Sequence, residues 1–288
     1  MSSIVRVTFP NVSNARSVFQ AIKALVTDIQ FSIVNHIDFT GIKVTTLDSN
    51  HVCVLYVNLE AEVENLASGE SVTLCVDSKI LSTAIKQVKE HNTMMFEYDP
   101  NKSGEHFLHV HQFQVRGGAA GKVTDICVKD APEQDELETD FDYPFVINLE
   151  MKELRCIVSE ATDFGSDMLT FVLNKARVSP TNIHNYLEIV TSGVVTNRNF
   201  YYTQHCSDTN SASMEIDDSI SIETKPDDLS FTKVMKCSIS IKYIKDFIAA
   251  LGSQKITLSI DNEMPLRLDY TIDEVSYITL FVTLKTEE

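Results

Sequence analysis

Hydrophobic and polar residues alternate along many short segments of this chain. The alternation is clearest in residues 52–59, 107–115, 187–190, 255–260 and 266–272, which are rich in β-branched and aromatic side chains. A period of two places every second side chain on the same face of a strand. These segments therefore predict β-strands that bury one face, and they are numerous enough to form extensive antiparallel sheets.

Four other segments repeat their apolar residues at helical spacing. The first helix is predicted over residues 14–29, the second begins at an N-cap supplied by Asp77 or Ser78, and the fourth ends at Gly252. The apolar stripes of the third and fourth helices are Leu154, Ile157, Val158 and Ala161, and Ile241, Ile244, Phe247, Ile248 and Leu251.

The order of these elements suggests an internal duplication. The chain runs helix, strands, helix, strands and then repeats that order, with the first and third helices offset by about 137 residues. This order predicts an α+β fold of two similar domains, each with two helices laid on antiparallel strands. We expect domains at residues 1–128 and 144–288, joined by a connector at residues 129–143.

Two stretches interrupt the pattern. Residues 129–143 read KDAPEQDELETDFDY, with seven acidic residues, one lysine and few apolar residues apart from Leu137 and Phe141. Such a segment is typical of an exposed linker extended by charge repulsion. Residues 206–228 are rich in Ser, Thr, Asp and Asn, which indicates a long loop or β-excursion in the second domain.

The net charge first argues against a nucleic-acid partner. The 288 residues include 41 acidic and 24 basic side chains, for a formal charge of −17, whereas phosphate binding requires positive charge. The basic residues nevertheless gather on single faces of the four predicted helices, where they could form one positive wall. These residues are Arg16, Lys23, Lys79, Lys86, Lys89, Lys152, Arg155, Lys242 and Lys245.

Candidate catalytic and metal-binding motifs are weak. The sequence RGGAAGK at residues 116–122 fails the phosphate-loop pattern, because Arg116 stands at the first glycine position and Val123 follows the lysine. His106, His109 and His111 lack further ligands of a metal site, and the six cysteines are too widely spaced for a zinc motif. We therefore expect no enzyme, cofactor or metal, and we find no membrane-spanning stretch or signal peptide.

One segment carries a family resemblance. Residues 44–52, VTTLDSNHV, closely resemble the LxSMDSSHV signature of the proliferating cell nuclear antigen family of DNA sliding clamps. Further similarities follow in order along the whole chain. They are DSKIL at residues 77–81, TSG at 191–193, IKYI at 241–244 followed by Phe247, and MPLRLDYTI at 264–272.

This resemblance implies a ring-shaped clamp. In the family, three chains close head to tail around duplex DNA, helices line the hole, and a clamp loader places the ring on DNA. By match, Arg16, Lys23, Lys79 and Lys242 occupy positions that face DNA. Helical periodicity adds Lys86, Lys89, Lys152, Arg155 and Lys245 to this sequence-independent double-stranded DNA surface.

The resemblance also implies two protein contacts. Short peptides of DNA polymerase and other partners would enter an apolar pocket beside the connector. Its residues by match are Val44, Leu47, His51, Leu137, Pro265, Phe281 and the tail from Thr283 to Lys285. The subunit contact would pair two edge strands, residues 122–129 with Val123, Asp125 and Cys127, and residues 195–203 with Asn197, Phe200 and Tyr202.

Several departures mark a divergent member of the family. Cys156 and Ser159 stand where the family has arginine, Phe281 replaces a tyrosine, and residues 174–186 resemble an insertion. A large DNA virus or a specialised paralogue would be a source of such a chain. We expect a homotrimer in the nucleus, or at a cytoplasmic replication site if viral. The alternatives are a non-encircling monomeric or dimeric processivity subunit and a checkpoint-type subunit of a heteromeric clamp.

Overall fold

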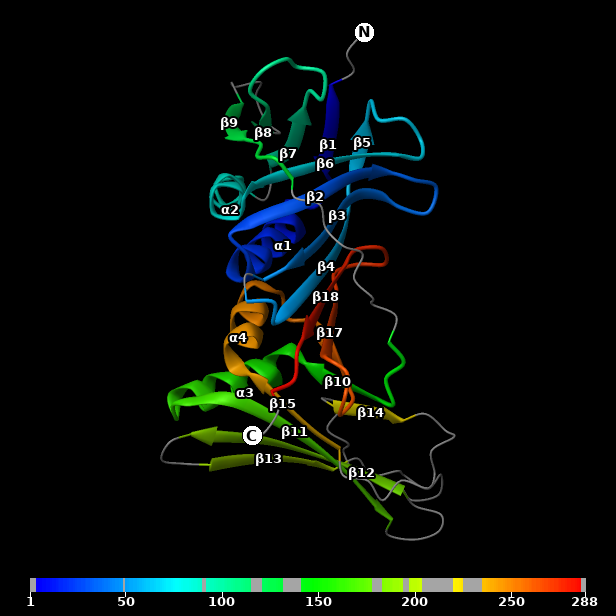
Figure 1. Ribbon diagram of the computed structural model, residues 1–288, viewed down its shortest axis with the longest axis vertical. Helices are drawn as coiled ribbons and strands as arrows, with labels where there is room; N and C mark the ends of the chain where they lie inside the picture. Colours follow the sequence, from blue (N-terminus) through cyan, green and yellow to red (C-terminus); the bar gives the residue numbers. More distant parts are fainter. Residues whose placement is uncertain are drawn as a thin grey trace. The chain divides into compact units, whose positions relative to one another are not determined.

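The computed structural model describes residues 4–48, 50–89, 92–114, 121–131, 141–177, 183–193, 197–203, 220–224 and 235–285 (Figure 1). The chain divides into two compact units. The N-terminal unit comprises Met1–Leu137 with Ala250–Gly252 and Thr271–Thr279, and the C-terminal unit comprises Glu138–Ala249, Ser253–Tyr270 and Leu280–Glu288.

The N-terminal unit holds two helices and two antiparallel sheets in its described residues. One sheet has the strand order β5-β1-β7-β8-β9, and the other has the order β4-β3-β2-β6. The elements are β1 (Val5–Phe9), α1 (Val12–Leu25), β2 (Asp28–Asn35), β3 (Thr40–Leu47), β4 (Cys53–Glu60), β5 (Glu62–Glu64), β6 (Glu70–Asp77), α2 (Ser78–Lys86), β7 (Asn92–Tyr98), β8 (Phe107–Gln114) and β9 (Lys122–Cys127).

The C-terminal unit is built in the same way over its described residues. Its sheets have the orders β14-β10-β16-β17-β18 and β13-β12-β11-β15. The elements are β10 (Phe145–Glu150), α3 (Met151–Asp163), β11 (Ser166–Arg177), β12 (Ile183–Gly193), β13 (Asn197–Thr203), β14 (Ile220–Thr224), β15 (Met235–Ser240), α4 (Ile241–Ala250), β16 (Lys255–Ile260), β17 (Leu266–Thr271) and β18 (Tyr277–Val282). Of these, Ala250, Thr271 and Tyr277–Thr279 at the ends of α4, β17 and β18 are counted with the N-terminal unit.

The two sets of elements correspond one to one. Each runs strand, helix, five strands, helix and three strands, and strand for strand the sheet orders are equivalent. This correspondence confirms the expected α+β fold of two similar domains. It also makes α1 the counterpart of α3, and α2 the counterpart of α4.

An aromatic cluster forms the core of the N-terminal unit. Phe9, Phe19, Phe31 and Phe96 come from β1, α1, β2 and β7, and their ring centroids lie 4.8–6.4 Å apart. All four side chains are at most 3% exposed. Three of the five ring pairs meet edge to face, an arrangement that adds to the free energy of burying the rings. The cluster thereby fixes α1 against both sheets.

The first helix ends earlier than the sequence predicted. Helix α1 begins at Val12, after the Asn11 side chain accepts a hydrogen bond from the Asn14 amide at 3.1 Å, and it ends at Leu25. Ile29, which was predicted to be helical, is a fully buried residue of β2. The prediction was wrong because the apolar alternation of β2 continues the helical stripe without a break.

The two stretches that interrupted the pattern are partly described. Strands β11 and β12 remain paired out to Arg177 and Ile183, so the described part of residues 174–186 extends a hairpin. Within residues 206–228, β14 pairs with β10, and residues 206–219 and 225–228 lie outside the described part. Among the described helices, none is long and apolar enough to cross a membrane.

Candidate nucleic-acid and peptide interface

Helices α1 and α2 lie side by side (Figure 1). They carry four of the five residues of the N-terminal unit that were predicted to face DNA, and the fifth, Lys89, follows α2. Neither helix contains an acidic residue. Lys23, Lys79, Lys86 and Lys89 are exposed, whereas Arg16 is half-buried and its Nη2 donates to the carbonyl oxygen of Val88, just past the end of α2. Four cationic side chains are thus available to an anionic ligand.

The helices of the C-terminal unit are less positive. Lys152, Lys242 and Lys245 are exposed. Helix α3 carries three acidic residues against two basic ones, and α4 carries Asp246 beside its two lysines. The guanidinium of Arg155 donates from Nε at 3.2 Å and Nη2 at 2.8 Å to the carbonyl oxygen of Ile248 in α4. The positive charge of the predicted surface is therefore concentrated in the N-terminal unit.

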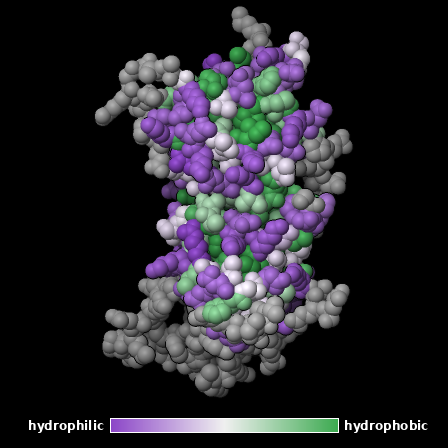
Figure 2. Space-filling view, turned by 90° about the vertical axis from the view of Figure 1, so that its left-hand side faces the viewer, coloured by the Kyte–Doolittle hydropathy of each residue, from purple (hydrophilic) through white to green (hydrophobic). Residues whose placement is uncertain are grey.

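Hydrophilic residues dominate the side of each unit that bears these helices, as Figure 2 shows. Helix α2 illustrates the cause, because its buried residues Leu81, Ala84 and Ile85 face the core while Lys79 and Lys86 are exposed. Its N-terminus is fixed by the Asp77 carboxylate, which accepts from the Ile80 amide at 2.9 Å. The cap and the apolar stripe together decide which way the lysines point.

The described residues of the DSNHV segment, 48 and 50–52, lie in a turn between β3 and β4. Asp48 is 3% exposed, and its Oδ1 accepts from the amides of Val52 at 2.6 Å and Cys53 at 2.8 Å. Its Oδ2 accepts from the Asn50 amide at 3.2 Å. His51 adopts a positive φ of 57° and is exposed. Asp48 is therefore the residue that shapes this turn, which sequence reasoning had treated only as part of a signature.

The predicted pocket residues lie in both units. In the N-terminal unit, Val44 is buried in β3, and Leu47 is half-buried at its end. In the C-terminal unit, Phe281 is buried, Pro265 is half-buried and Thr283 is exposed. Leu137 lies outside the described residues.

Sequence reasoning missed the side chains that surround Phe281. The ring of Phe141 meets it edge to face, with centroids 5.9 Å apart and an interplanar angle of 70°. The Arg267 guanidinium lies 5.7 Å from the Phe281 centroid and pairs through Nε with Asp269 at 2.7 Å. The sequence signal that could have indicated this contact was Phe141 itself, an isolated apolar residue in an acidic segment.

A buried tyrosine fixes the chain beside this cluster. The Tyr143 hydroxyl donates to the carbonyl oxygen of Pro265 at 2.7 Å, and its ring meets that of Phe141 at 6.3 Å. Burial raises the pKa of Tyr143 well above its ordinary value, and Asp269 raises it further, against an opposing effect of Arg267. The hydroxyl therefore remains a hydrogen-bond donor throughout the neutral range.

Among the described strands, the two predicted for the subunit contact lie at sheet edges. Strand β9 pairs with β8, and β13 pairs with β12, at the ends of their sheets. On β9, Val123, Asp125 and Cys127 are exposed. On β13, Phe200 is half-buried, whereas the side chains of Asn197 and Tyr202 lie outside the described part.

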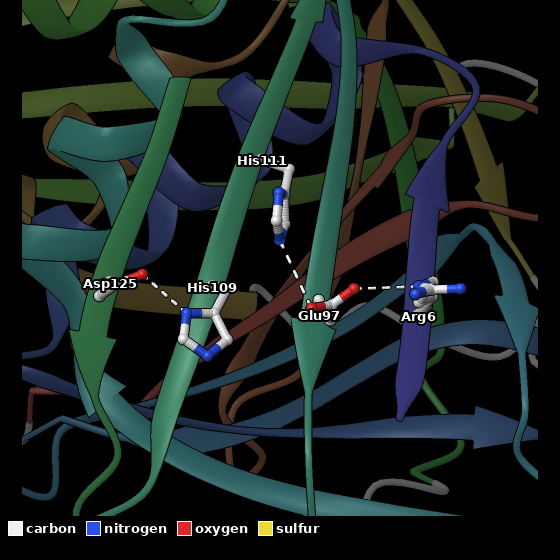
Figure 3. Close-up of polar contacts among 5 residues, drawn as sticks. All are labelled: Arg6, Glu97, His109, His111 and Asp125. Carbon is white, nitrogen blue, oxygen red and sulfur yellow. Dashed lines mark hydrogen bonds and ion pairs between the residues drawn. The ribbon is translucent and has the colours of Figure 1, made fainter. Parts of the chain in front are cut away.

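A row of polar contacts crosses the sheet beside β9. His109 Nδ1 lies 2.7 Å from Asp125 Oδ1, and Glu97 lies between His111, at 3.8 Å, and Arg6, at 2.9 Å (Figure 3). Each imidazole therefore lies beside one carboxylate, His109 beside Asp125 and His111 beside Glu97. Among the described residues, no group of three or more His, Cys, Asp or Glu side chains could hold a metal ion.

The fold defines a class of protein. The chain is similar to a crystal structure of proliferating cellular nuclear antigen from Entamoeba histolytica, with a TM-score of 0.74 over 99% of this chain and 100% of that chain, at 16% identity. It therefore has the DNA-clamp fold.

Sequence comparisons agree with the fold. Residues 5–116 match the family model of the proliferating cell nuclear antigen N-terminal domain. The chain is also 23% identical over 282 residues to proliferating cell nuclear antigen of Caenorhabditis elegans, covering 96% of this chain and 95% of that protein. The resemblance to the proliferating cell nuclear antigen family is thereby confirmed.

Proposed function

We propose that this chain is a DNA sliding clamp, a non-enzymatic processivity factor that encircles duplex DNA and tethers DNA polymerase and other replication and repair proteins. The observation that carries the proposal is the set of exposed lysines on α1 and α2, helices without acidic residues in a chain of net charge −17. In a clamp, helices with this local positive charge would face the phosphates of duplex DNA. A nuclear or other replication-site location follows from the role.

Lysines on helix faces suit a ligand that must be held and still move. They interact with phosphates without reading bases, so the affinity depends on salt and not on sequence. An acidic exterior would repel duplex DNA elsewhere on the protein. The proposed DNA surface comprises the exposed residues Lys23, Lys79, Lys86, Lys89, Lys152, Lys242 and Lys245. It also includes the half-buried Arg16 and Arg155.

Ring closure would use the two edge strands. Strands β9 and β13 each leave one side of a sheet without a neighbour in the described part of the chain. Pairing β9 of one copy with β13 of the next satisfies both edges, and a head-to-tail contact of this kind closes into a ring when the rotation permits. We propose a homotrimer that a clamp loader opens and places on DNA.

Partner proteins would bind through short peptides. The proposed peptide-binding residues are Val44, Leu47 and His51 in the N-terminal unit, and Pro265, Phe281 and Thr283 in the C-terminal unit, with Leu137 from the connector. Apolar side chains such as Leu47 and Phe281 suit the aromatic and aliphatic anchors of a short helix.

A DNA retention assay tests the clamp directly. The protein is loaded on nicked circular DNA and on the same DNA after linearisation, and its mass is measured by light scattering. A trimer that is retained on circles and lost from linear ends supports the proposal. Equal retention on both forms, together with a monomeric mass, contradicts encirclement.

Charge reversal tests the DNA surface. Changing Lys23 and Lys79 to Glu should weaken retention and reduce the slope of log affinity against log salt by about 2, one for each lost phosphate contact. The matched control reverses Lys43 and Lys102, two exposed lysines of the same unit that lie outside its helices. An unchanged slope in the first variant would show that α1 and α2 do not contact DNA.

The uneven charge of the helices favours a second candidate. The acidic residues of α3 leave less positive charge on the helices of the C-terminal unit. A non-encircling monomeric or dimeric processivity subunit would tolerate this, because it could hold DNA mainly through the N-terminal unit. That protein would stimulate a polymerase without forming a trimer. A checkpoint-type subunit would neither self-associate nor stimulate a polymerase, so mass and primer-extension length separate the three.

A further inference from the structure

Phe281 is an apolar ring on a polar sheet face. In β17, Leu266 and Leu268 are fully buried, while the intervening Arg267 and Asp269 retain side-chain exposures of 33% and 25%. In β18, Leu280 and Val282 are likewise fully buried, and Phe281 lies between them on the alternate face. Its exposure is nevertheless only 5%, so side chains on this polar face of the sheet must cover the ring.

The cover includes Phe141. Its ring approaches Phe281 edge to face at 5.9 Å, which is the arrangement that two aromatic side chains prefer. The Arg267 guanidinium, 5.7 Å from the Phe281 centroid, is a second neighbour on the same face. A ligand that is to contact Phe281 on this face must therefore displace a covering neighbour such as one of these two groups.

Phe141 is the group that can leave at lower cost. Arg267 is held by its ion pair with Asp269, whereas Phe141 is half-buried and the described residues 141–144 form no helix or strand. Two residues further on, Tyr143 is 6% exposed and bonded to the Pro265 carbonyl. Phe141 can turn away from Phe281 while Tyr143 keeps the chain attached.

We infer that Phe141 is an internal occupant of the position where a partner would insert its own aromatic side chain, and that binding replaces one ring by the other. The inference rests on the proposed peptide site. It adds an internal competitor to that site: an aromatic anchor of the peptide would restore the edge-to-face contact that Phe141 now makes, whereas an aliphatic anchor would lose it. Peptide affinity is therefore lowered by the cost of displacing Phe141.

Peptide titration with Phe141→Ala tests the exchange. The probe is a fluorescein-labelled helical peptide with two adjacent aromatic residues, and its twin has leucine at both positions. Removing Phe141 should tighten binding of the aromatic peptide by about 2- to 12-fold, the contribution of one aromatic pair. Phe164→Ala, which removes an exposed phenylalanine at the end of α3, is the matched control and should leave the affinity unchanged.

A second variant reports the displacement itself. In Phe141→Trp, the fluorescence emission should move to longer wavelength when saturating aromatic peptide expels the indole into water. The inference is overturned if wild type binds the aromatic peptide and Phe141→Ala binds it no more tightly. It is also overturned if the emission of Phe141→Trp does not shift at saturation. Either result leaves the proposed peptide site in place. Equal affinity for the leucine twin also overturns the inference, whereas failure of wild type and Phe141→Ala alike to bind either peptide refutes the proposed site.

Discussion

Arg16 and Arg155 occupy the same position in equivalent helices and make the same kind of contact. Each is the fifth residue of its helix, α1 or α3, and each donates to a backbone carbonyl near the end of the companion helix, Val88 after α2 and Ile248 in α4. Carbonyls at a helix end lack partners within the helix, and a cation there complements the helix dipole. The two arginines therefore join the helices of each pair.

Replacing Arg155 by Met should show how much this contact between α3 and α4 stabilises the fold. The change keeps the aliphatic stem and removes the donors, so the free energy of unfolding should fall by about 1.5–3 kcal/mol, the typical contribution of a hydrogen bond with a charged partner. Urea denaturation followed by circular dichroism measures it. The control is Lys152→Met on the same helix, whose exposed side chain should contribute less than about 0.5 kcal/mol. Equal losses in both variants would argue against the assignment.

Asp48→Ala should destabilise the β3–β4 turn. The change leaves the amides of Asn50, Val52 and Cys53 without their carboxylate acceptor, at a cost of about 2–4 kcal/mol for a buried charge-assisted group. Thermal unfolding measures the loss, and hydrogen exchange at Val52 and Cys53 localises it. Asp38→Ala, in the exposed β2–β3 turn, is the control. Unchanged protection at these two amides would contradict the role given to Asp48.

Gly41→Ala should be among the most damaging substitutions of a small residue. Gly41 has a φ of 149°, and an added Cβ would collide with the carbonyl oxygen of Leu59 and lie 2.9 Å from the Ala61 amide nitrogen. The Leu59 oxygen belongs to the paired strand β4, and Ala61 directly follows that strand. Because both obstacles are backbone atoms, we expect a loss of about 2–4 kcal/mol. Chemical denaturation of the variant measures this loss.

Gly69→Ala provides the comparison for that substitution. Gly69 also has a positive φ, of 88°, but nothing lies within 4 Å of an added Cβ. Its replacement should therefore cost only the conformational strain, about 1 kcal/mol. If the two variants were equally stable, steric contact with β4 would not be the reason for glycine at position 41.

Cysteine reactivity should divide the described thiols into two classes. Cys127 and Cys156 are exposed, whereas Cys53, Cys75 and Cys237 are buried. Burial raises the pKa of Cys237 from 9.0 to about 12, so its reactive thiolate is scarce at neutral pH. Iodoacetamide at pH 8 should modify Cys127 and Cys156 first, as peptide mass spectrometry would show. Early modification of Cys237 would contradict its burial.

The same pKa shift predicts a loss of stability in alkali. Above about pH 9 an unfolded Cys237 ionises, whereas the folded thiol stays protonated until about pH 12. The free energy of unfolding should therefore fall across this window, and less so in Cys237→Ala. Urea denaturation of both proteins at pH 7.5 and pH 10 measures the difference.

Local patterns in the sequence determined the elements and their duplication. Apolar spacing marked the four helices, Asp77 is the N-cap among the two candidates Asp77 and Ser78, and Gly252 follows α4 as expected. These features depend on residues within one or two turns of each other, where periodicity and capping act directly. The matching segments also led to the clamp family, whose fold the structure shares.

Only the tertiary structure decided what the individual side chains contact. The nine basic residues looked alike in sequence, yet Arg16 and Arg155 bond to carbonyls 72 and 93 residues away. Phe141 looked like an apolar residue in an acidic linker, but it packs on Phe281 in a distant strand. Such pairs depend on strand register and helix packing across the whole chain, because a side chain's partner is chosen by the fold and not by its neighbours in sequence.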